Sequence, residues 1–349
     1  MTRTNRIMFF ALDNIIWLIL LLFFIINSFI TPNFLTYRNI VNILYNASIL
    51  SMLVLGEGII LATGQIDLSL ESTLAFAPTI AVLFMVEWIP GLNPVLAIVI
   101  TLLAGGLVGL FNGFCVTKIG INTFLQGLSV LIILRGFVLF LVPFALSKFP
   151  YTYNYLGNAK AFANIPVAVI VMLTIYAAFH IFLKNMRVGR YFFATGGNLK
   201  ASYVSGINTD KIIMTSFALA GVLAAVGGLL AVGRQTSVSN RIGDGMVLLA
   251  FAGAILGGTS ITGGRGSAIG MLGGAIFLSS ISNSLNLLRV NVFLVYAAQG
   301  LLIFLALLVD RSKERVTAYL FQQERLRKYR ASVHSGIEQK AKIIAASSG

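Results

Sequence analysis

Few side chains in this sequence could do acid–base or charge chemistry within its long apolar runs. Glu57 and Asp67 flank a polar break at 63–67, and Arg135 lies near the middle of a later apolar run. An ionised side chain is costly in hydrocarbon, so each of these residues needs a partner or a function. We expect Arg135 to pair with one of the two acids, which would satisfy both charges. Direct contact with a substrate is the alternative.

Four neutral amides lie in similar apolar surroundings, and their chemistry is hydrogen bonding. They are Asn112, Gln126, Asn283 and Asn286. Such groups can line a wet path for a solute, and they can equally bridge helices within a membrane. Both interpretations stay open from the residues alone. Together with Asp67 and Arg135, these amides make up the predicted translocation path.

The sequence carries no catalytic or metal-binding pattern. Paired acids, Ser–His pairs and His/Cys clusters at suitable spacing are missing, and the single Cys115 rules out an intramolecular disulfide. The glycine-rich run 256–266 has neither the lysine nor the following Ser/Thr of a Walker A motif. We therefore expect no catalytic residue, no metal and no cofactor bound by this chain, and a membrane enzyme is disfavoured.

The composition is typical of a polytopic helical membrane protein. Hydrophobic residues make up 58% of the 349 residues, and 10% are charged. A helix needs about twenty apolar residues to cross a bilayer. On that guide we predict an all-α fold of about ten transmembrane helices, at 12–31, 40–63, 68–86, 94–117, 122–145, 164–184, 211–232, 245–262, 267–288 and 291–309. The eighth is short and glycine-rich, so we expect it to be broken or re-entrant.

The net charge of +14 does not indicate nucleic-acid binding, because the basic residues gather in two places. Five of the 25 lie in 184–211, and nine lie in the tail from Arg311 to Lys342. This bias is the positive-inside signature of membrane proteins. With ten spans it places both termini, Lys118 and 184–211 in the cytoplasm.

Glycines at four-residue spacing mark two of the predicted spans. They are Gly105, Gly109 and Gly113 in the fourth span and Gly266, Gly270 and Gly274 in the ninth. This spacing lets helix backbones approach closely in lipid, so each span should have a tight helix neighbour. The two spans lie five apart and run in opposite directions, which suggests an inverted five-plus-five repeat; glycine abundance alone is the alternative.

The most informative stretch is 184–211, which is too basic and too rich in glycine to span a membrane. Its signals are an N-cap at Asn198, apolar residues at every fourth position (Leu199, Tyr203 and Ile207) and a stop at Gly206. These signals predict a two-turn amphipathic helix, which cannot bury its apolar face alone. The helix packs on the protein's own bundle or fits a groove on a partner, unless the stretch is only a solvated loop.

Ten short segments complete the pattern, in a specific order along nearly the whole chain. They are 64–69 (Gly-Gln-Ile-Asp-Leu-Ser), 109–113 (Gly-Leu-Phe-Asn-Gly), 121–124 (Ile-Asn-Thr-Phe), 135–136 (Arg-Gly), 189–190 (Gly-Arg), 196–198 (Gly-Gly-Asn), 205–207 (Ser-Gly-Ile), 256–260 (Leu-Gly-Gly-Thr-Ser), 263–266 (Gly-Gly-Arg-Gly) and 286–288 (Asn-Leu-Leu). With them the chain resembles the permease subunits of bacterial ATP-driven importers for ribose, other monosaccharides and autoinducer-type sugars.

The resemblance implies a transport subunit that is not itself an enzyme. Its expected partners are two cytoplasmic ATPase subunits that use ATP-Mg, a second copy or a homologous permease, a periplasmic sugar-binding protein and the lipid of the bacterial inner (cytoplasmic) membrane. The apolar spans and the charges that follow them divide the chain into a transmembrane permease domain over 1–313 and a basic cytoplasmic tail over 314–349. The resemblance also makes 184–211 the segment that couples to the ATPase, through Gly189, Arg190, Gly196, Gly197, Asn198, Leu199, Tyr203, Gly206 and Ile207.

Three departures from the family pattern bear on the solute. Gln65 stands where the family usually has glycine, Gln126 is polar within an apolar run, and Val247 and Leu249 replace an acidic pair. The missing acids imply either a different polyol or a second permease that retains them. A branched-chain amino acid permease of the same superfamily is the alternative function, followed by a self-sufficient channel or secondary carrier.

Overall fold

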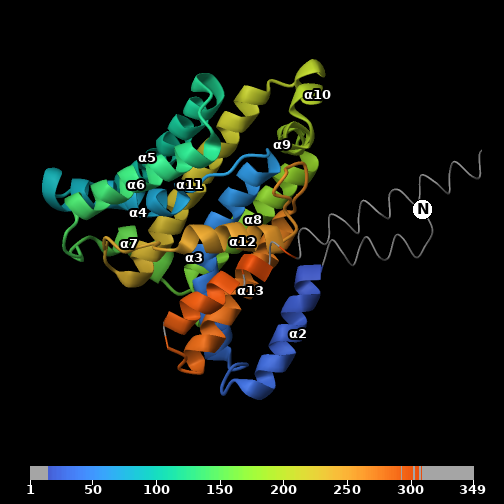
Figure 1. Ribbon diagram of the computed structural model, residues 1–349. Helices are drawn as coiled ribbons and strands as arrows, with labels where there is room; N and C mark the ends of the chain where they lie inside the picture. The colour runs from blue at the N-terminus through green and yellow to red at the C-terminus, as the bar shows by residue number, and fades with distance from the viewer. Residues whose placement is uncertain (1–14, 292, 302, 306–307, 309–349) are drawn as a thin grey trace, which may run out of the picture.

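The computed structural model describes residues 15–291, 293–301, 303–305 and 308. Its α-helices are α2 Ile15–Ile30, α3 Tyr37–Ala62, α4 Leu70–Leu83, α5 Pro94–Phe114, α6 Thr123–Leu141, α7 Tyr151–Asn158, α8 Val167–Asn185, α9 Arg187–Gly197, α10 Leu199–Val204, α11 Thr209–Gln235, α12 Met246–Leu256 and α13 Ala268–Leu287 (Figure 1). Helices α4 and α5 continue into π-helical turns, Phe84–Trp88 and Cys115–Ile119. The described residues contain two isolated β-bridges and no strand. The predicted all-α fold is therefore confirmed.

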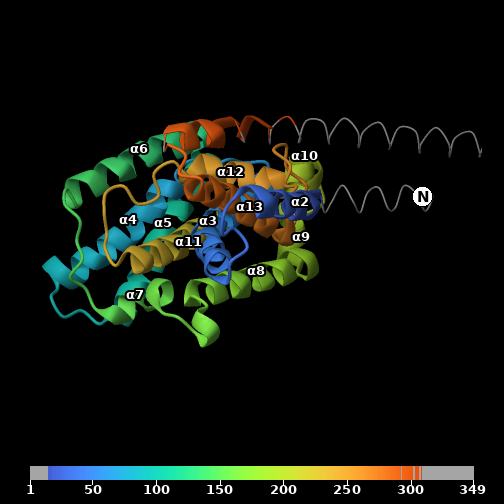
Figure 2. The same cartoon turned by 90° about the horizontal axis from the view of Figure 1, so that it is seen from below.

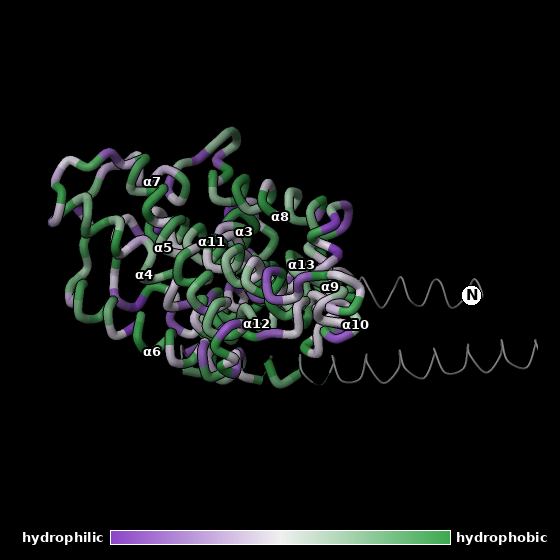
Figure 3. Tube along the Cα trace, turned by 90° about the horizontal axis from the view of Figure 1, so that it is seen from above, coloured by the Kyte–Doolittle hydropathy of each residue, from purple (hydrophilic) through white to green (hydrophobic). Residues whose placement is uncertain are grey.

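Seven of the described helices are long and apolar enough to cross a membrane, namely α3, α4 and α5 with their π turns, α6, α8, α11 and α13. The other three predicted spans correspond to shorter apolar helices: α2, α12 and the turns over 293–301 and 303–305. Figure 3 shows hydrophobic residues along α8 and hydrophilic residues around α9 and α10. Residues 1–14 and the predicted tail 314–349 lie outside the described part. The chain is thus a multi-pass membrane protein, and the helix at the eighth predicted span is short.

Helices α3 and α11 form the centre of the bundle (Figure 2). Helix α11 packs on α4 and α5, and α3 packs on α12 and α13. Within the first set α4 contacts α5, and within the second set α12 contacts α13 in the same way. In the order of the ten predicted spans, α3, α4 and α5 correspond to the second to fourth, and α11, α12 and α13 correspond to the seventh to ninth. An inverted repeat of five spans predicts this matching set of contacts.

Two glycine seams bring these neighbours close together. On α5, a Cβ added at Gly105 would overlap the Gly221 carbonyl of α11. On α13, a Cβ added at Gly270 would overlap the Gly257 carbonyl at the end of α12. Both glycine-spaced spans have the tight helix neighbour that the sequence predicts. Such close backbone contact stabilises helix pairs in lipid through van der Waals packing.

Two connections bring polar residues into this bundle. One, 63–69, joins α3 to α4, and the other, 236–245, joins α11 to α12. The helices that follow them start beside each other, because Glu71 Oε2 in the first turn of α4 accepts a hydrogen bond from the Val247 amide of α12 at 3.1 Å. The starts of α4 and α12 therefore lie side by side, and α4 also packs against α6.

Candidate functional site

Three elements bring together a buried group that we call the amide cluster: Asp67, Ser69, Asn112 and Gln126. In the 63–69 connection, Asp67 Oδ1 accepts a hydrogen bond from the Ser69 amide at 2.8 Å. Asn112 of α5 donates through Nδ2 to Ser69 Oγ at 2.8 Å and to Asp67 Oδ2 at 3.3 Å. Gln126 of α6 donates through Nε2 to Asn112 Oδ1 at 3.2 Å. The structure thus joins three of the predicted path residues, Asp67, Asn112 and Gln126, in one chain of hydrogen bonds.

The amide cluster is buried within the protein. Helix α6 approaches the 63–69 connection through Gly127, where a Cβ would lie 2.6 Å from the Leu68 amide nitrogen. Burial raises the pKa of the Asp67 carboxyl above its ordinary value, and the hydrogen bonds it accepts within the cluster oppose that rise. The cluster offers donors and acceptors around one carboxyl without a fixed counter-charge, a set of groups that suits hydroxylated molecules.

Glu57 of α3 is also fully buried and lies near Asp67. Neither of its carboxyl oxygens makes a hydrogen bond of full geometry, although the Asp67 amide lies close by. The prediction that Arg135 pairs with Glu57 or Asp67 is wrong, because Arg135 pairs with other acids. On α6 it lies nine residues beyond Gln126, which is roughly 13 Å along a helix axis. That distance separates it from the end of α6 that meets Asp67.

Arg135 belongs to a second group, the arginine cluster, which it forms with Glu71 and Asp244. Its Nη2 lies 3.3 Å from Glu71 Oε1 and 2.8 Å from Asp244 Oδ1. Its Nη1 donates at 3.1 Å to the carbonyls of Asn240 and Ile242. The Asp244 side chain is 55% exposed, whereas the other two are largely buried. One guanidinium therefore holds the start of α4 and the 236–245 connection against α6.

Sequence reasoning missed Glu71 and Asp244. Glu71 carried the same signal as Glu57, an acid within an apolar span. Asp244 stands between two glycines in a connection without periodicity, so no pattern pointed to its partner. Glu71 also bears on the acidic pair that Val247 and Leu249 replace. Its carboxylate accepts a hydrogen bond from the amide of Val247, so it lies beside a position where the family pattern has an acid. Carboxylates from other elements thus lie at the start of α12, where its dipole favours negative charge.

Helix α13 carries the last two predicted path residues. Asn283 is buried, and its Oδ1 has no hydrogen-bond partner among the described residues. Asn286 is exposed near the end of the helix. Within the described part of the chain, neither side chain bonds to the amide cluster or to the arginine cluster. Their place on a translocation path stays a prediction.

The coupling segment, 184–211, contains α9 and α10, although the sequence predicted only the second helix. Helix α10 begins after Asn198, whose Oδ1 accepts a hydrogen bond from the Ala201 amide at 2.9 Å. It ends at Val204, and Gly206 follows with a φ of +85° and an amide that donates to the Tyr203 carbonyl at 3.0 Å. Ile207, which was predicted to extend the apolar side of this helix, therefore lies beyond its end. The predicted N-cap and stop signal are both confirmed.

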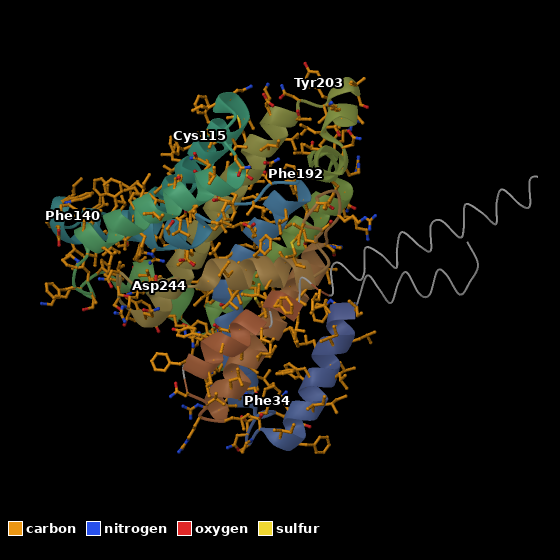
Figure 4. All side chains as sticks on the ribbon, in the orientation of Figure 1. Phe34, Cys115, Phe140, Phe192, Tyr203 and Asp244 are labelled. Carbon is orange, nitrogen blue, oxygen red and sulfur yellow. The ribbon has the colours of Figure 1, made fainter. Side chains whose placement is uncertain are left out.

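The apolar side of α10 is largely uncovered. The exposed fraction is 49% for Leu199, 71% for Tyr203 and 85% for Val204. Figure 4 shows Tyr203 at the tip of α10, pointing away from the bundle, with Asp244 in a different part of the molecule. An exposed apolar group of this kind, surrounded by basic residues, is typical of a surface that binds a partner.

Helix α9 escaped the sequence analysis because three of its eleven residues are glycine, which disfavours helix. Tertiary contacts with α8 stabilise it instead. A Cβ at Gly189 would overlap the Phe182 carbonyl of α8, and Arg190 Nη1 donates to the Asn185 carbonyl at 3.0 Å. Phe192 is fully buried, with its ring 5.7 Å from that of Phe182. Packing therefore overrides the weak propensity of this stretch.

Comparisons with known proteins agree over most of the chain. Residues 39–307 match the family described as "Branched-chain amino acid transport system / permease component". A ribose import permease protein of Escherichia coli (strain K12) is 33% identical over 304 residues, 84% of this chain and 92% of that protein. A D-allose transport system permease protein of the same strain is 31% identical over 280 residues, 80% of this chain and 85% of that protein. A galactose/methyl galactoside import permease protein of Haemophilus influenzae is 30% identical over 319 residues, 86% of this chain and 94% of that protein. No solved structure matches.

Proposed function

The chain belongs to the family of branched-chain amino acid transport system permease components, and on that premise we propose that it is the permease subunit of an ATP-driven importer for a sugar or sugar alcohol. The assignment of the solute as a sugar or sugar alcohol rests on the agreement among the relatives. Those named above are permeases for ribose, allose and galactose, and each alignment covers at least 80% of this chain. The family description itself supplies the rival solute, a branched-chain amino acid.

The chemistry of the amide cluster supports a neutral, hydroxylated solute. In the proposed path, Asp67, Asn112 and Gln126 exchange their mutual hydrogen bonds for bonds to solute hydroxyls. A hydroxyl both donates and accepts, so amides and a carboxyl satisfy it without a counter-charge. A zwitterionic amino acid needs partners of both signs. Arg135, the nearest cation on α6, is already balanced by Glu71 and Asp244.

The exposed side of α10 is the proposed contact with a cytoplasmic ATPase subunit, which binds and hydrolyses ATP-Mg. A short amphipathic helix commonly binds in a groove of its partner. The proposed assembly contains two ATPase subunits, a second copy of this chain or a homologous permease, and a periplasmic sugar-binding protein. It lies in the bacterial inner membrane, with both termini of this chain in the cytoplasm.

Uptake measurements in cells that express the complete importer test the solute class. Deleting this chain should abolish uptake of the labelled solute, and unlabelled pentoses, hexoses or sugar alcohols should compete with it. Leucine and valine at the same concentration should not. Competition by the amino acids alone would replace the sugar assignment with the branched-chain amino acid alternative, and uptake without any ATPase subunit would favour a self-sufficient carrier.

A matched pair of substitutions tests the coupling contact. Tyr203→Asp places a charge on the exposed side of α10, where an unpaired desolvated charge disfavours association. Tyr151→Asp makes the same change at another exposed tyrosine, at the start of α7. Copurification of the ATPase subunit should be lost in the first variant and kept in the second. If the ATPase copurifies equally with both, α10 is not the contact.

The same two tyrosines test the orientation in the membrane. Single cysteines are placed at Tyr203 or Tyr151 after Cys115, which is buried, has been replaced by alanine. An impermeant thiol reagent added to spheroplasts should label the cysteine at 151 and leave the cysteine at 203 unlabelled. Labelling at 203 from outside would reverse the proposed orientation.

A further inference from the structure

Three backbone turns meet at the end of α9 in what we call the glycine junction. It consists of Gly64 in the 63–69 connection, Gly196 in α9, and Gly263 and Gly264 in the connection from α12 to α13. The Gly264 amide donates a hydrogen bond to the Ala62 carbonyl at 3.0 Å. This bond ties the α12–α13 connection to the last residue of α3, directly before the 63–69 connection, and the end of α9 lies against both.

The glycine junction has no room for side chains. A Cβ added at Gly196 would overlap the Ala62 carbonyl oxygen and lie 2.8 Å from the Gly264 amide nitrogen. From the opposite side, a Cβ at Gly263 would lie 2.8 Å from the Gly196 carbonyl oxygen and 2.9 Å from the Gly64 Cα. Cβ atoms in real proteins do not approach other heavy atoms so closely. The three turns therefore touch through their backbones.

A contact between backbones transmits displacement well, because it contains no side-chain rotamers that could absorb the movement. Each turn also leads to a different part of the molecule. Helix α9 continues through Asn198 into α10, the 63–69 connection continues into the amide cluster, and the α12–α13 connection leads into α13. A movement of α10 therefore has a direct path to the amide cluster and to the start of α13.

We propose that the glycine junction transmits movement of the coupling segment to the α3–α4 and α12–α13 connections at once, so that ATPase action rearranges the amide cluster. Gly196 is then a positioning residue for transport and contacts neither the solute nor the ATPase. The proposal rests on the proposed function, in which α10 moves with the ATPase subunit. It predicts that damage at the junction separates ATPase binding from solute uptake.

A glycine outside the coupling segment supplies the matched control. Gly196→Ala adds a methyl that must push the two connections away, whereas the methyl of Gly136→Ala, on α6, has no atom within 4 Å. We expect Gly196→Ala to lower ATP-dependent uptake by about tenfold or more, a typical size for coupling between sites. The ATPase subunit should still copurify with it, and Gly136→Ala should import like the unmodified chain. Equal uptake by the two variants overturns the proposal, and so does loss of ATPase binding in Gly196→Ala.

A second measurement leaves every junction glycine in place. Single cysteines at Gln65 and Thr262, in the Cys115→Ala background, report on the two connections through their rate of thiol labelling. Both rates should change when a non-hydrolysable ATP analogue traps the assembled importer, and neither should change when Tyr203→Asp is also present. A change in one connection only, or in neither, overturns the junction. Failure of the proposed function is seen separately, as an unmodified chain that neither imports sugar nor binds an ATPase.

Discussion

The amide cluster and the arginine cluster both contact α6, and they satisfy buried polar groups in different ways. In the amide cluster, amide and hydroxyl groups surround one carboxyl. In the arginine cluster, one guanidinium lies between two carboxylates and two carbonyls. Removing one partner of a buried ion pair leaves an uncompensated charge, so such a group is hard to rearrange. A neutral hydrogen bond contributes little net free energy and can be exchanged for another.

This difference suggests a division of work along α6. The arginine cluster is suited to hold the start of α4, the 236–245 connection and α6 as one body. The amide cluster is suited to change partners, as contact with a passing solute requires. The glycine junction fits this division, because it touches the 63–69 connection, which supplies Asp67 and Ser69 to the amide cluster. The moving part would then lie at the start of α6 and the fixed part beyond its middle.

Breaking the arginine cluster should have the largest effect on stability. Arg135→Met removes the guanidinium and leaves Glu71 buried without its cation, which costs roughly 3–5 kcal/mol for a buried pair. We expect a large fall in the unfolding midpoint of the purified chain and in its accumulation in the membrane. Arg241→Met is the matched control, because Arg241 is exposed in the same connection. Adding Glu71→Gln to Arg135→Met should recover part of the loss, and equal stability of the two arginine variants would contradict this role.

Changing the amide cluster should instead affect transport more than stability. Gln126→Leu removes one hydrogen bond and leaves Asn112 Oδ1 without that donor, which costs about 1–3 kcal/mol when an acceptor is buried. We expect the chain still to assemble with its partners while uptake falls further than the loss of folded protein explains. Uptake per assembled complex is the measurement. Ser129→Ala is the control on the same helix, because among the described residues the Ser129 hydroxyl bonds only the Leu125 carbonyl of its own helix.

The sequence was sufficient to predict those features that depend on local signals. Hydropathy located the long apolar helices, and the Asn198 cap and Gly206 stop followed from local backbone requirements. The glycine spacing correctly predicted tight helix neighbours. The partner of Arg135 did not follow, because Glu71 and Asp244 reach it from segments that lie far apart in the sequence. Helix α9 was missed for a similar reason, since its contacts with α8 outweigh its glycine content.

The same distinction between local signals and long-range packing applies to the candidate site. Polar residues in apolar runs correctly marked Asp67, Asn112 and Gln126, because an isolated polar group in a membrane requires a partner. That rule identifies which residues need partners and does not say which partners they find. It could not show that Asn283 and Asn286 lie apart from the cluster, or that three glycine turns meet at α9. Those facts depend on the packing of whole helices.

The smallest expected effect concerns proton binding by the amide cluster. Burial raises the pKa of Asp67 in the folded chain above its unfolded value, which is about 3.9 for an ordinary aspartate. Between the two pKa values the folded chain binds more protons, so its stability falls as the pH rises through that window and then levels off. Asp67→Asn keeps the size of the side chain and an oxygen that can accept from the Ser69 amide, but it does not titrate. The free energy of unfolding of the unmodified chain should therefore decline from pH 4 toward neutral pH relative to that of Asp67→Asn, by no more than about 1.4 kcal/mol for each unit of pKa shift. Parallel curves for the two chains would show that Asp67 stays equally acidic in the folded and unfolded states, and would remove the contrast in how the two clusters handle a buried carboxyl.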